Sequence, residues 1–174
     1  MRIRLSQSGP PCSRVIRAIV ISIMLAFSPL PVFAGPFDDT FVALQGSWSG
    51  TGAIVMSGGN KERIRCDANH HIGSSSNELR LELTCASDSY KFDLQGQITA
   101  SGDAISGNWF EKTRATGGAI SGRIAGNQLQ VRAEGQTFNA LLSVTTRGER
   151  QTISIQSPGS EMSDVTITLT RKSR

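Results

Sequence analysis

The sequence predicts an all-β protein, an antiparallel up-and-down meander of about eight to ten strands closed into a small barrel. Two observations predict this fold. Apolar residues recur at every second position from Trp48 to the strand-like segment at 165–169, which is the period of half-buried strands. The segments between these runs, such as GSSSN at 73 and SPGS at 157, are too short to hold crossover helices, so consecutive strands must pair antiparallel. We favour a barrel because closure removes exposed strand edges, and a β-sandwich is the alternative.

Residues 1–34 have the features of a cleavable export signal that forms a helix. Arginines precede the apolar run AIVISIMLAF, and the small residues Val32 and Ala34 stand before Gly35. The apolar run covers residues 18–27, whereas a membrane-spanning helix needs roughly 20 residues, so we predict cleavage after Ala34 and no stable membrane anchor. An uncleaved anchor is the alternative. The mature chain, residues 35–174, is expected to be periplasmic or secreted.

Loss of this segment changes the charge of the protein. The full chain carries 18 basic and 14 acidic residues, and the signal holds four of the basic ones and no acidic one. The mature chain is therefore formally neutral. Because the excess positive charge is discarded with the signal, the composition does not indicate nucleic-acid binding. We expect residues 35–174 to form a single domain and a monomer.

A short helical lead-in is expected at 35–46, ahead of the strands. An aspartate at position 38 or 39 can cap its first turn, and Gly46 can end it. Three apolar residues recur at helical spacing: Phe37, Phe41 and Leu44. We expect their side chains to close one end of the barrel as a plug, and a peripheral flap is the alternative.

Two cysteines remain after export, Cys66 and Cys85, and an oxidising compartment favours a disulfide between them. The strand pattern tests this pairing. If Ile72 faces Leu79 across the GSSSN turn, Cys66 falls directly opposite Cys85, and opposed residues of an antiparallel pair lie within disulfide range. A loop of this length is expected to contribute about 3 kcal/mol.

A zinc site at the cysteines is the alternative to the disulfide. It needs two more ligands, and His70 and His71 lie nearby in the sequence. Successive strand residues point to opposite faces, however, so the two histidines cannot both join the cysteines. We therefore expect no metal site.

The motif AISG occurs twice, at 104 and at 119, in consecutive predicted strands. In a strand, Ile105, Gly107 and Trp109 point to the same inner face, and the second copy repeats this arrangement. Glycine on an inner face lets the strand coil sharply and leaves space for a large neighbour across the sheet. Gly50, close behind Trp48, is expected to act in the same way.

Several of these motifs resemble those of known barrels. LQGSW at 44–48, which opens the first strand after a helical turn, resembles the G-x-W signature of lipocalins. ISGNW and ISGRI resemble the strand pattern of avidin-type barrels. The likeness implies the calycin group of small antiparallel barrels, whose members commonly bind small apolar ligands in the lumen. The mature chain also resembles a type of uncharacterised exported bacterial protein. Biotin binding is not carried over, because the tryptophans that wall the biotin site of avidins are missing.

We therefore expect a binding protein for a small, mostly apolar ligand. The alternative is a protein-binding envelope module, such as a protease or lysozyme inhibitor, whose loops would carry the binding residues. His70 is expected inside, as a hydrogen-bonded core residue, with a ligand role as the alternative. Glu111 lies two residues after Trp109 and therefore points to the same inner face. It is expected at the solvated rim of the barrel, with contact to a polar ligand group as the alternative. The lumen candidates are Trp48, Gly50, His70, Tyr90, Phe92, Gly107, Trp109 and Glu111.

The sequence contains no nucleophile elbow, paired carboxylates at catalytic spacing, metal-binding triplet or phosphate loop. We therefore expect no enzymatic activity and no cofactor. The expected partner is an unknown small apolar molecule, or an envelope protein in the alternative case.

Overall fold

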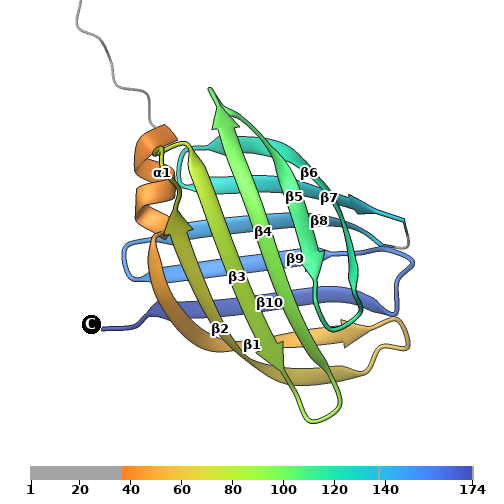
Figure 1. Cartoon of the computed structure of the whole chain (residues 1–174). Coiled ribbons are helices and arrows are strands. Elements are labelled where there is room, and N and C mark those ends of the chain that lie inside the picture. The colour runs from red at the N-terminus through yellow and green to blue at the C-terminus, as the bar shows by residue number, and fades with distance from the viewer. Residues whose placement is uncertain (1–36, 137, 174) are drawn as a thin grey trace, which may run out of the picture. The chain divides into compact units, whose positions relative to one another are not determined.

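The computed structural model describes residues 37–136 and 138–173 (Figure 1). The predicted export signal lies outside the described residues. One helix and ten strands follow along the chain: α1 (Phe37–Leu44), β1 (Gly46–Met56), β2 (Lys61–Ile72), β3 (Glu78–Ala86), β4 (Lys91–Ser101), β5 (Ala104–Glu111), β6 (Thr116–Ala125), β7 (Gln128–Gly135), β8 (Asn139–Arg147), β9 (Arg150–Gln156) and β10 (Met162–Arg171).

The strands form a closed antiparallel barrel in which each strand pairs with its neighbours in sequence, and β1 pairs with β10 to close the sheet (Figure 1). The closing ladder runs from Trp48 opposite Arg171 to Met56 opposite Met162. The predicted meander and its closure are confirmed, and the sandwich alternative is wrong. Closure leaves no strand edge without a partner in this sheet.

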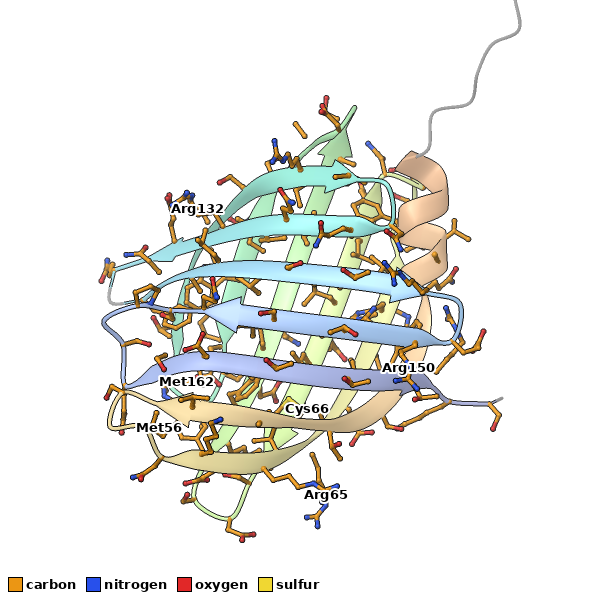
Figure 2. The ribbon with its side chains drawn as sticks, turned by 180° about the vertical axis from the view of Figure 1, so that it is seen from behind. Met56, Arg65, Cys66, Arg132, Arg150 and Met162 are labelled. Carbon is orange, nitrogen blue, oxygen red and sulfur yellow. A yellow bond between two sulfur atoms is a disulfide. The ribbon has the colours of Figure 1, made fainter. Side chains whose placement is uncertain are left out.

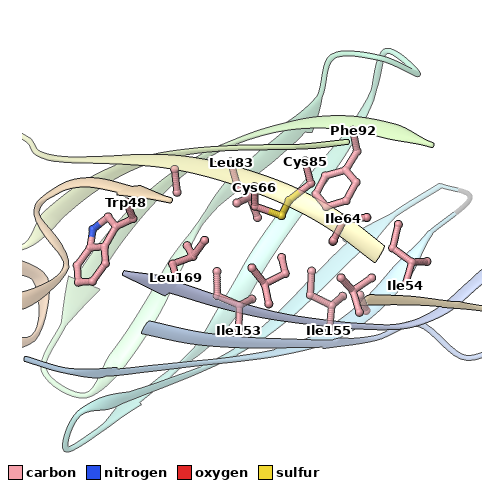
Figure 3. Close-up of a cluster of buried hydrophobic side chains, with 14 residues drawn as sticks. Trp48, Ile54, Ile64, Cys66, Leu83, Cys85, Phe92, Ile153, Ile155 and Leu169 are labelled. Atoms are coloured by element: carbon pink, nitrogen blue, oxygen red, sulfur yellow. A yellow bond between two sulfur atoms is a disulfide. The ribbon is translucent and has the colours of Figure 1, made fainter. Parts of the chain in front are cut away.

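The register of the β2–β3 hairpin is the one that the sequence predicts. Ile72 faces Leu79, and Cys66 faces Cys85, with Cα atoms 4.2 Å apart. The two sulfurs form a disulfide inside the barrel, among buried side chains that include Leu83 (Figure 3). The predicted disulfide is confirmed.

Alternate side chains along each strand face the interior. In β2, for example, Ile64 and Cys66 are buried while Arg65 between them is exposed. Figure 2 shows Arg65 and Arg132 on the outer face of the barrel. The buried side chains form two adjoining clusters, one around the disulfide and one around Trp109, and both leave space along the barrel interior.

Helix α1 lies at one end of the barrel (Figure 1). It falls within the predicted lead-in, and its side chains Phe41 and Leu44 are almost fully buried against the cluster that contains Leu79 and Ile98. This is the arrangement expected of a plug. None of the described helices is long and apolar enough to cross a membrane.

Candidate functional site

A cavity of about 280 Å³ runs inside the barrel. It extends from Leu44, the last residue of α1, and His70 in β2 to Tyr90, Arg114 and Met162 in or beside the turns at the opposite end. Its volume is close to the lower limit of ligand pockets, roughly 300 to 1,000 Å³. Most of its wall is aliphatic or aromatic, with strands β3, β4 and β8 contributing Leu81, Leu83, Phe92, Leu94, Leu142 and Val144.

Of the eight lumen candidates predicted from the sequence, the structure places five in the cavity wall: His70, Tyr90, Phe92, Trp109 and Glu111. These residues come from both ends and from the middle of the barrel. The alternation of inward and outward residues along a strand therefore predicts which side chains reach the interior, but it does not predict how deep along the barrel each one lies.

The other three candidates, Trp48, Gly50 and Gly107, do not line the cavity. A Cβ atom on Gly107 would collide with the backbone carbonyl of Gln97 in the adjacent strand, and one on Gly50 would collide with that of Thr168. The missing side chains are therefore replaced by neighbouring backbone, and these glycines permit close strand approach. The predictions that Gly50 and Gly107 leave space across the sheet and line the lumen are therefore wrong.

Trp48 is fully buried at the end of the barrel that α1 covers. Its indole nitrogen donates a hydrogen bond to the carbonyl of Leu44 at 2.8 Å. The guanidinium of Arg171 lies over the indole, 4.1 Å from the ring centre, and donates to the carbonyls of Ala43 and Gln45. Trp48 and Arg171 thus satisfy carbonyls that the last turn of a helix leaves unpaired, and they hold the plug in place.

A polar chain crosses the closed end of the cavity. His70 Nε2 lies 3.2 Å from Gln151 Oε1, and Gln151 Nε2 donates to Thr146 Oγ1 at 3.3 Å. His70 comes from β2 and Gln151 from β9, which are separated by β1 and β10 in the sheet. Burial lowers the pKa of His70, and its hydrogen bond to Gln151 offsets this only in part. The imidazole is therefore neutral at pH 7.

Gln151 is fully buried and was not among the predicted candidates. A signal for it exists in the sequence, because Gln151 shares the inward parity of Ile153 and Ile155 in β9. A polar side chain at an inward position needs a partner. The sequence does not show that this partner is His70.

The open end of the cavity is organised by Glu111. Its carboxylate accepts hydrogen bonds from the backbone N–H groups of Asp93, Thr113 and Arg114 at 2.7 to 3.0 Å. Burial by itself would raise the pKa of Glu111, but these donors outweigh it and lower the pKa to about 2. Glu111 is only 7% exposed, so the expectation of a solvated rim residue is wrong. Its oxygens accept hydrogen bonds from backbone N–H groups of the β5–β6 turn.

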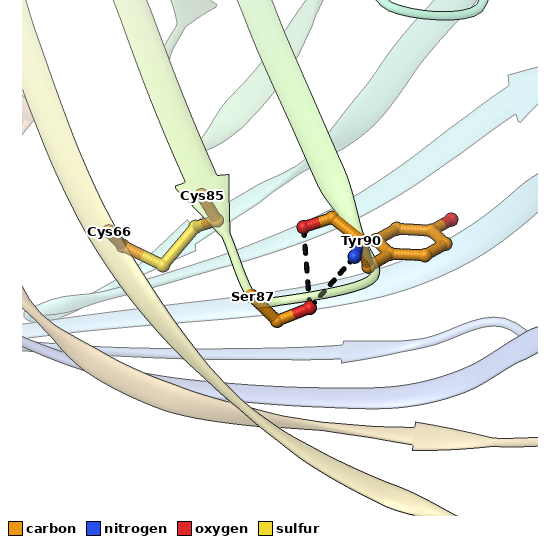
Figure 4. The surroundings of a disulfide bond; sticks show 4 residues. All are labelled: Cys66, Cys85, Ser87 and Tyr90. Carbon is orange, nitrogen blue, oxygen red and sulfur yellow. Dashed lines mark hydrogen bonds between the residues drawn. A yellow bond between two sulfur atoms is a disulfide. The ribbon is translucent and has the colours of Figure 1, made fainter.

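Tyr90 and Arg114 form one side of the opening. The Ser87 hydroxyl accepts a hydrogen bond from the Tyr90 N–H at 2.9 Å in the turn beside the disulfide (Figure 4). The Arg114 guanidinium lies 4.6 Å from the centre of the Tyr90 ring and 3.4 Å from a Glu111 oxygen. A cation held over an aromatic face in this way restrains both side chains. Arg114 was not among the lumen candidates predicted from the sequence, and its side chain, although 44% exposed, also lines the cavity.

Among the described residues, no group of three or more histidine, cysteine, aspartate or glutamate side chains is placed to hold a metal ion. The two cysteines are joined to each other, and the nearby His70 is hydrogen-bonded to Gln151. The cavity wall itself offers apolar contact along most of its length, the polar pair of His70 and Gln151 at one end, and the charged residues Glu111, Arg114 and Glu161 at the other.

No family model matches the sequence, and no curated protein matches it. Solved structures do resemble the barrel. Rv2717c from M. tuberculosis is 14% identical, with a TM-score of 0.66 over 80% of this chain and 99% of that one. The S-type phycobiliprotein lyase CPES from Guillardia theta is 10% identical, with a TM-score of 0.57 over 79% of this chain and 93% of that one. These likenesses show the fold alone: the chain forms a small closed antiparallel barrel like the barrels of these two proteins.

Proposed function

We propose that this protein is a binding protein that holds one small, mostly apolar molecule inside its barrel. The observation that carries the proposal is the cavity of about 280 Å³ with its largely apolar wall. Protein interiors are close-packed, and they hold few voids larger than a water molecule. Small barrels of this kind are usually filled by their own side chains. A cavity that stays open along the barrel axis is what a ligand site requires.

The proposal favours binding over catalysis. The cavity wall contains two carboxylates, Glu111 and Glu161, and one histidine, His70. The oxygens of Glu111 are already used by backbone donors, and His70 is engaged with Gln151. The ionisable group beside Glu111 is the guanidinium of Arg114, which stays protonated in proteins and therefore does not exchange a proton with a substrate. The likeness to a phycobiliprotein lyase, at 10% identity, brings no activity to this chain.

We propose further that the protein works outside the cytoplasm. The disulfide between Cys66 and Cys85 supports this proposal, because such bonds persist in oxidising compartments. The composition of residues 1–34 supports it independently. Mass spectrometry of the protein recovered from its native compartment would locate the mature N-terminus, and a chain that still begins at Met1 there would contradict cleavage after Ala34.

The binding proposal can be tested with a defined probe, 2-methylnaphthalene. An engineered cavity of about 150 Å³ binds benzene, so a cavity of about 280 Å³ is large enough for a bicyclic hydrocarbon. Isothermal titration calorimetry should show one site per chain with a negative heat-capacity change, which marks the burial of apolar surface. Native mass spectrometry of gently purified protein would show whether a natural ligand is retained.

A matched pair of variants distinguishes binding of the probe inside the cavity from binding on the outer surface. Leu142 lines the cavity, and its neighbour Leu141 lies on the outer face, 47% exposed. Leu142→Trp should fill the cavity and abolish binding of the probe, whereas Leu141→Trp should leave it unchanged, provided circular dichroism shows both barrels folded. Binding that survives Leu142→Trp, or absence of probe binding by the wild-type protein, would refute the proposal.

A further inference from the structure

A groove lies on the outer face of the barrel, over strands β6 to β9. It has a volume of about 580 Å³, and its lining includes two arginines, three glutamines, three serines and one exposed leucine. Figure 2 shows Arg132, one of the two arginines, on this face. No aspartate or glutamate of the described chain lines this outer groove. Its chemistry therefore differs from that of the apolar cavity on the other side of the sheet.

The register of the strands explains why the sheet is hollowed here. On the outer face, Ser143 of β8 lies opposite Ser154 of β9. The next outward row along these strands contains longer side chains, because Leu141 lies opposite both Arg132 and Gln156. Two short side chains beside a row of long ones leave a depression between the strands.

A ladder of hydrogen bonds orders the polar side chains of the outer groove. Arg123 Nε donates to Gln130 Oε1 at 2.9 Å, and Gln130 Nε2 donates to Gln128 Oε1 at 3.3 Å. Gln128 Nε2 in turn donates to the hydroxyl of Ser143 at 2.7 Å. Side chains that already restrain one another lose less conformational entropy when a ligand binds, so the groove is partly preorganised.

The two guanidinium groups carry positive charge without a carboxylate partner. No ion pair among the described residues involves Arg123 or Arg132. The ladder uses only Nε of Arg123, which leaves the terminal N–H groups of that guanidinium for a ligand. Glu134 of β7 and Asp164 of β10 lie nearby on the outer face, but they do not line the groove. The outer groove is therefore complementary to an anionic group.

We infer that the outer groove binds an acidic saccharide, a sugar that carries a carboxylate, sulfate or phosphate group. A guanidinium provides paired N–H donors that match the oxygens of such a group. Glutamine and serine side chains both donate and accept hydrogen bonds, as sugar hydroxyls do. Leu141, 47% exposed, provides apolar surface for the C–H face of a sugar ring.

The distribution of charge favours a short acidic saccharide over an extended polyanion. Nucleic-acid binding draws its affinity from the neutralisation of many phosphates along the strand. The outer groove has two cations, and Glu134 and Asp164 lie beyond it on either side. A longer polyanion would meet these carboxylates. The groove lies across the sheet from the cavity, so the inference does not depend on what the cavity binds.

The test compares α-1,4-digalacturonate with its methyl diester, which keeps the same sugar rings and removes both negative charges. In ¹⁵N–¹H correlation spectra of the labelled protein, digalacturonate should shift the side-chain amide signals of Gln128 and Gln130 until they saturate. The diester should bind about tenfold more weakly. Sodium sulfate at the same ionic strength should not produce saturable shifts. Equal binding of the diester, or saturation by sulfate at the same concentrations, would overturn the inference.

A matched pair of arginine variants locates the site. Arg132→Gln should weaken binding of digalacturonate about tenfold, because it removes a charge-assisted pair of hydrogen bonds. Arg65→Gln removes an equally exposed charge from the outer face of β2 and should leave binding unchanged (Figure 2). Circular dichroism checks that both barrels are folded.

Three further results would overturn the inference. One is the absence of saturable shifts in the wild-type protein, and another is an equal loss of binding in the two variants. The third is binding to phosphatidylglycerol vesicles that Arg132→Gln abolishes, without any binding of digalacturonate, since it would assign the outer groove to a membrane surface. The proposed cavity function is measured separately with 2-methylnaphthalene, and Arg132→Gln should leave binding of that probe unchanged.

Discussion

Replacement of Glu111 by glutamine should destabilise the barrel in a pH-dependent way. The carboxylate accepts three backbone hydrogen bonds in and around the β5–β6 turn, and its pKa falls from 4.5 to about 2. Each unit of difference between the two pKa values is equivalent to about 1.4 kcal/mol. The charge on Glu111 therefore contributes about 3 kcal/mol to the free energy of unfolding at pH 7. Glu111→Gln removes the charge and turns amide hydrogens toward backbone N–H donors.

The sign of the pH dependence follows from the lowered pKa. The contribution is complete above pH 4.5, where the carboxyl group is ionised in both the folded and the unfolded chain. It declines as the pH falls from 4.5 toward 2, because the unfolded chain takes up the proton first. Urea unfolding of the wild-type protein and the variant should therefore differ by about 3 kcal/mol at pH 7, and the difference should nearly vanish at pH 2.

The exposed Glu134 provides the control, and Glu134→Gln should change the stability by less than about 0.5 kcal/mol at either pH. Two results would refute the reasoning for Glu111. A loss of stability below about 1 kcal/mol at pH 7 would mean that the hydrogen bonds from the backbone donors are nearly as stabilising without the negative charge. A loss of the same size at every pH would mean that it comes from packing.

Three further predictions concern the scaffold. Gly107→Ala should lower the stability strongly because its Cβ would collide with adjacent backbone, whereas Gly58→Ala, where the space is open, should be nearly neutral in urea unfolding. Arg171→Met should remove hydrogen bonds to the end of α1, costing about 1 to 3 kcal/mol, and should speed amide hydrogen exchange in that helix more than in the strands. Joint replacement of Cys66 and Cys85 by alanine should cost about 3 kcal/mol and leave the β-sheet circular dichroism in place.

The fold could be predicted from the sequence because two independent signals agree in it. Alternation assigns each residue of β2 and β3 to a face, and the cysteines fix which residues lie opposite each other. A shift of the hairpin by one residue would have sent Cys66 and Cys85 to opposite faces. The short turns then require consecutive strands to pair antiparallel, because a parallel pair needs a long crossover connection.

The pairing of His70 with Gln151 could not be predicted in the same way. The two residues are 81 positions apart and lie on strands that are not neighbours in the sheet. Their contact crosses the lumen, so it depends on the diameter and the strand tilt of the closed barrel. Alternation shows that both side chains point inward, but it carries no information on these two quantities.

The inward glycines show most clearly where pattern reasoning reaches its limit. A glycine on an inner face removes a side chain from the lumen, and this can have two opposite results: the space stays open, or the neighbouring strand moves into it. At Gly50 and Gly107 the neighbouring backbone occupies the space. The open volume is lined instead by inward side chains of β2 to β10, the leucines of β3, β4 and β8 among them. The size of the cavity therefore depends on how far apart the closed sheet places its walls, and the strand pattern alone does not give that distance.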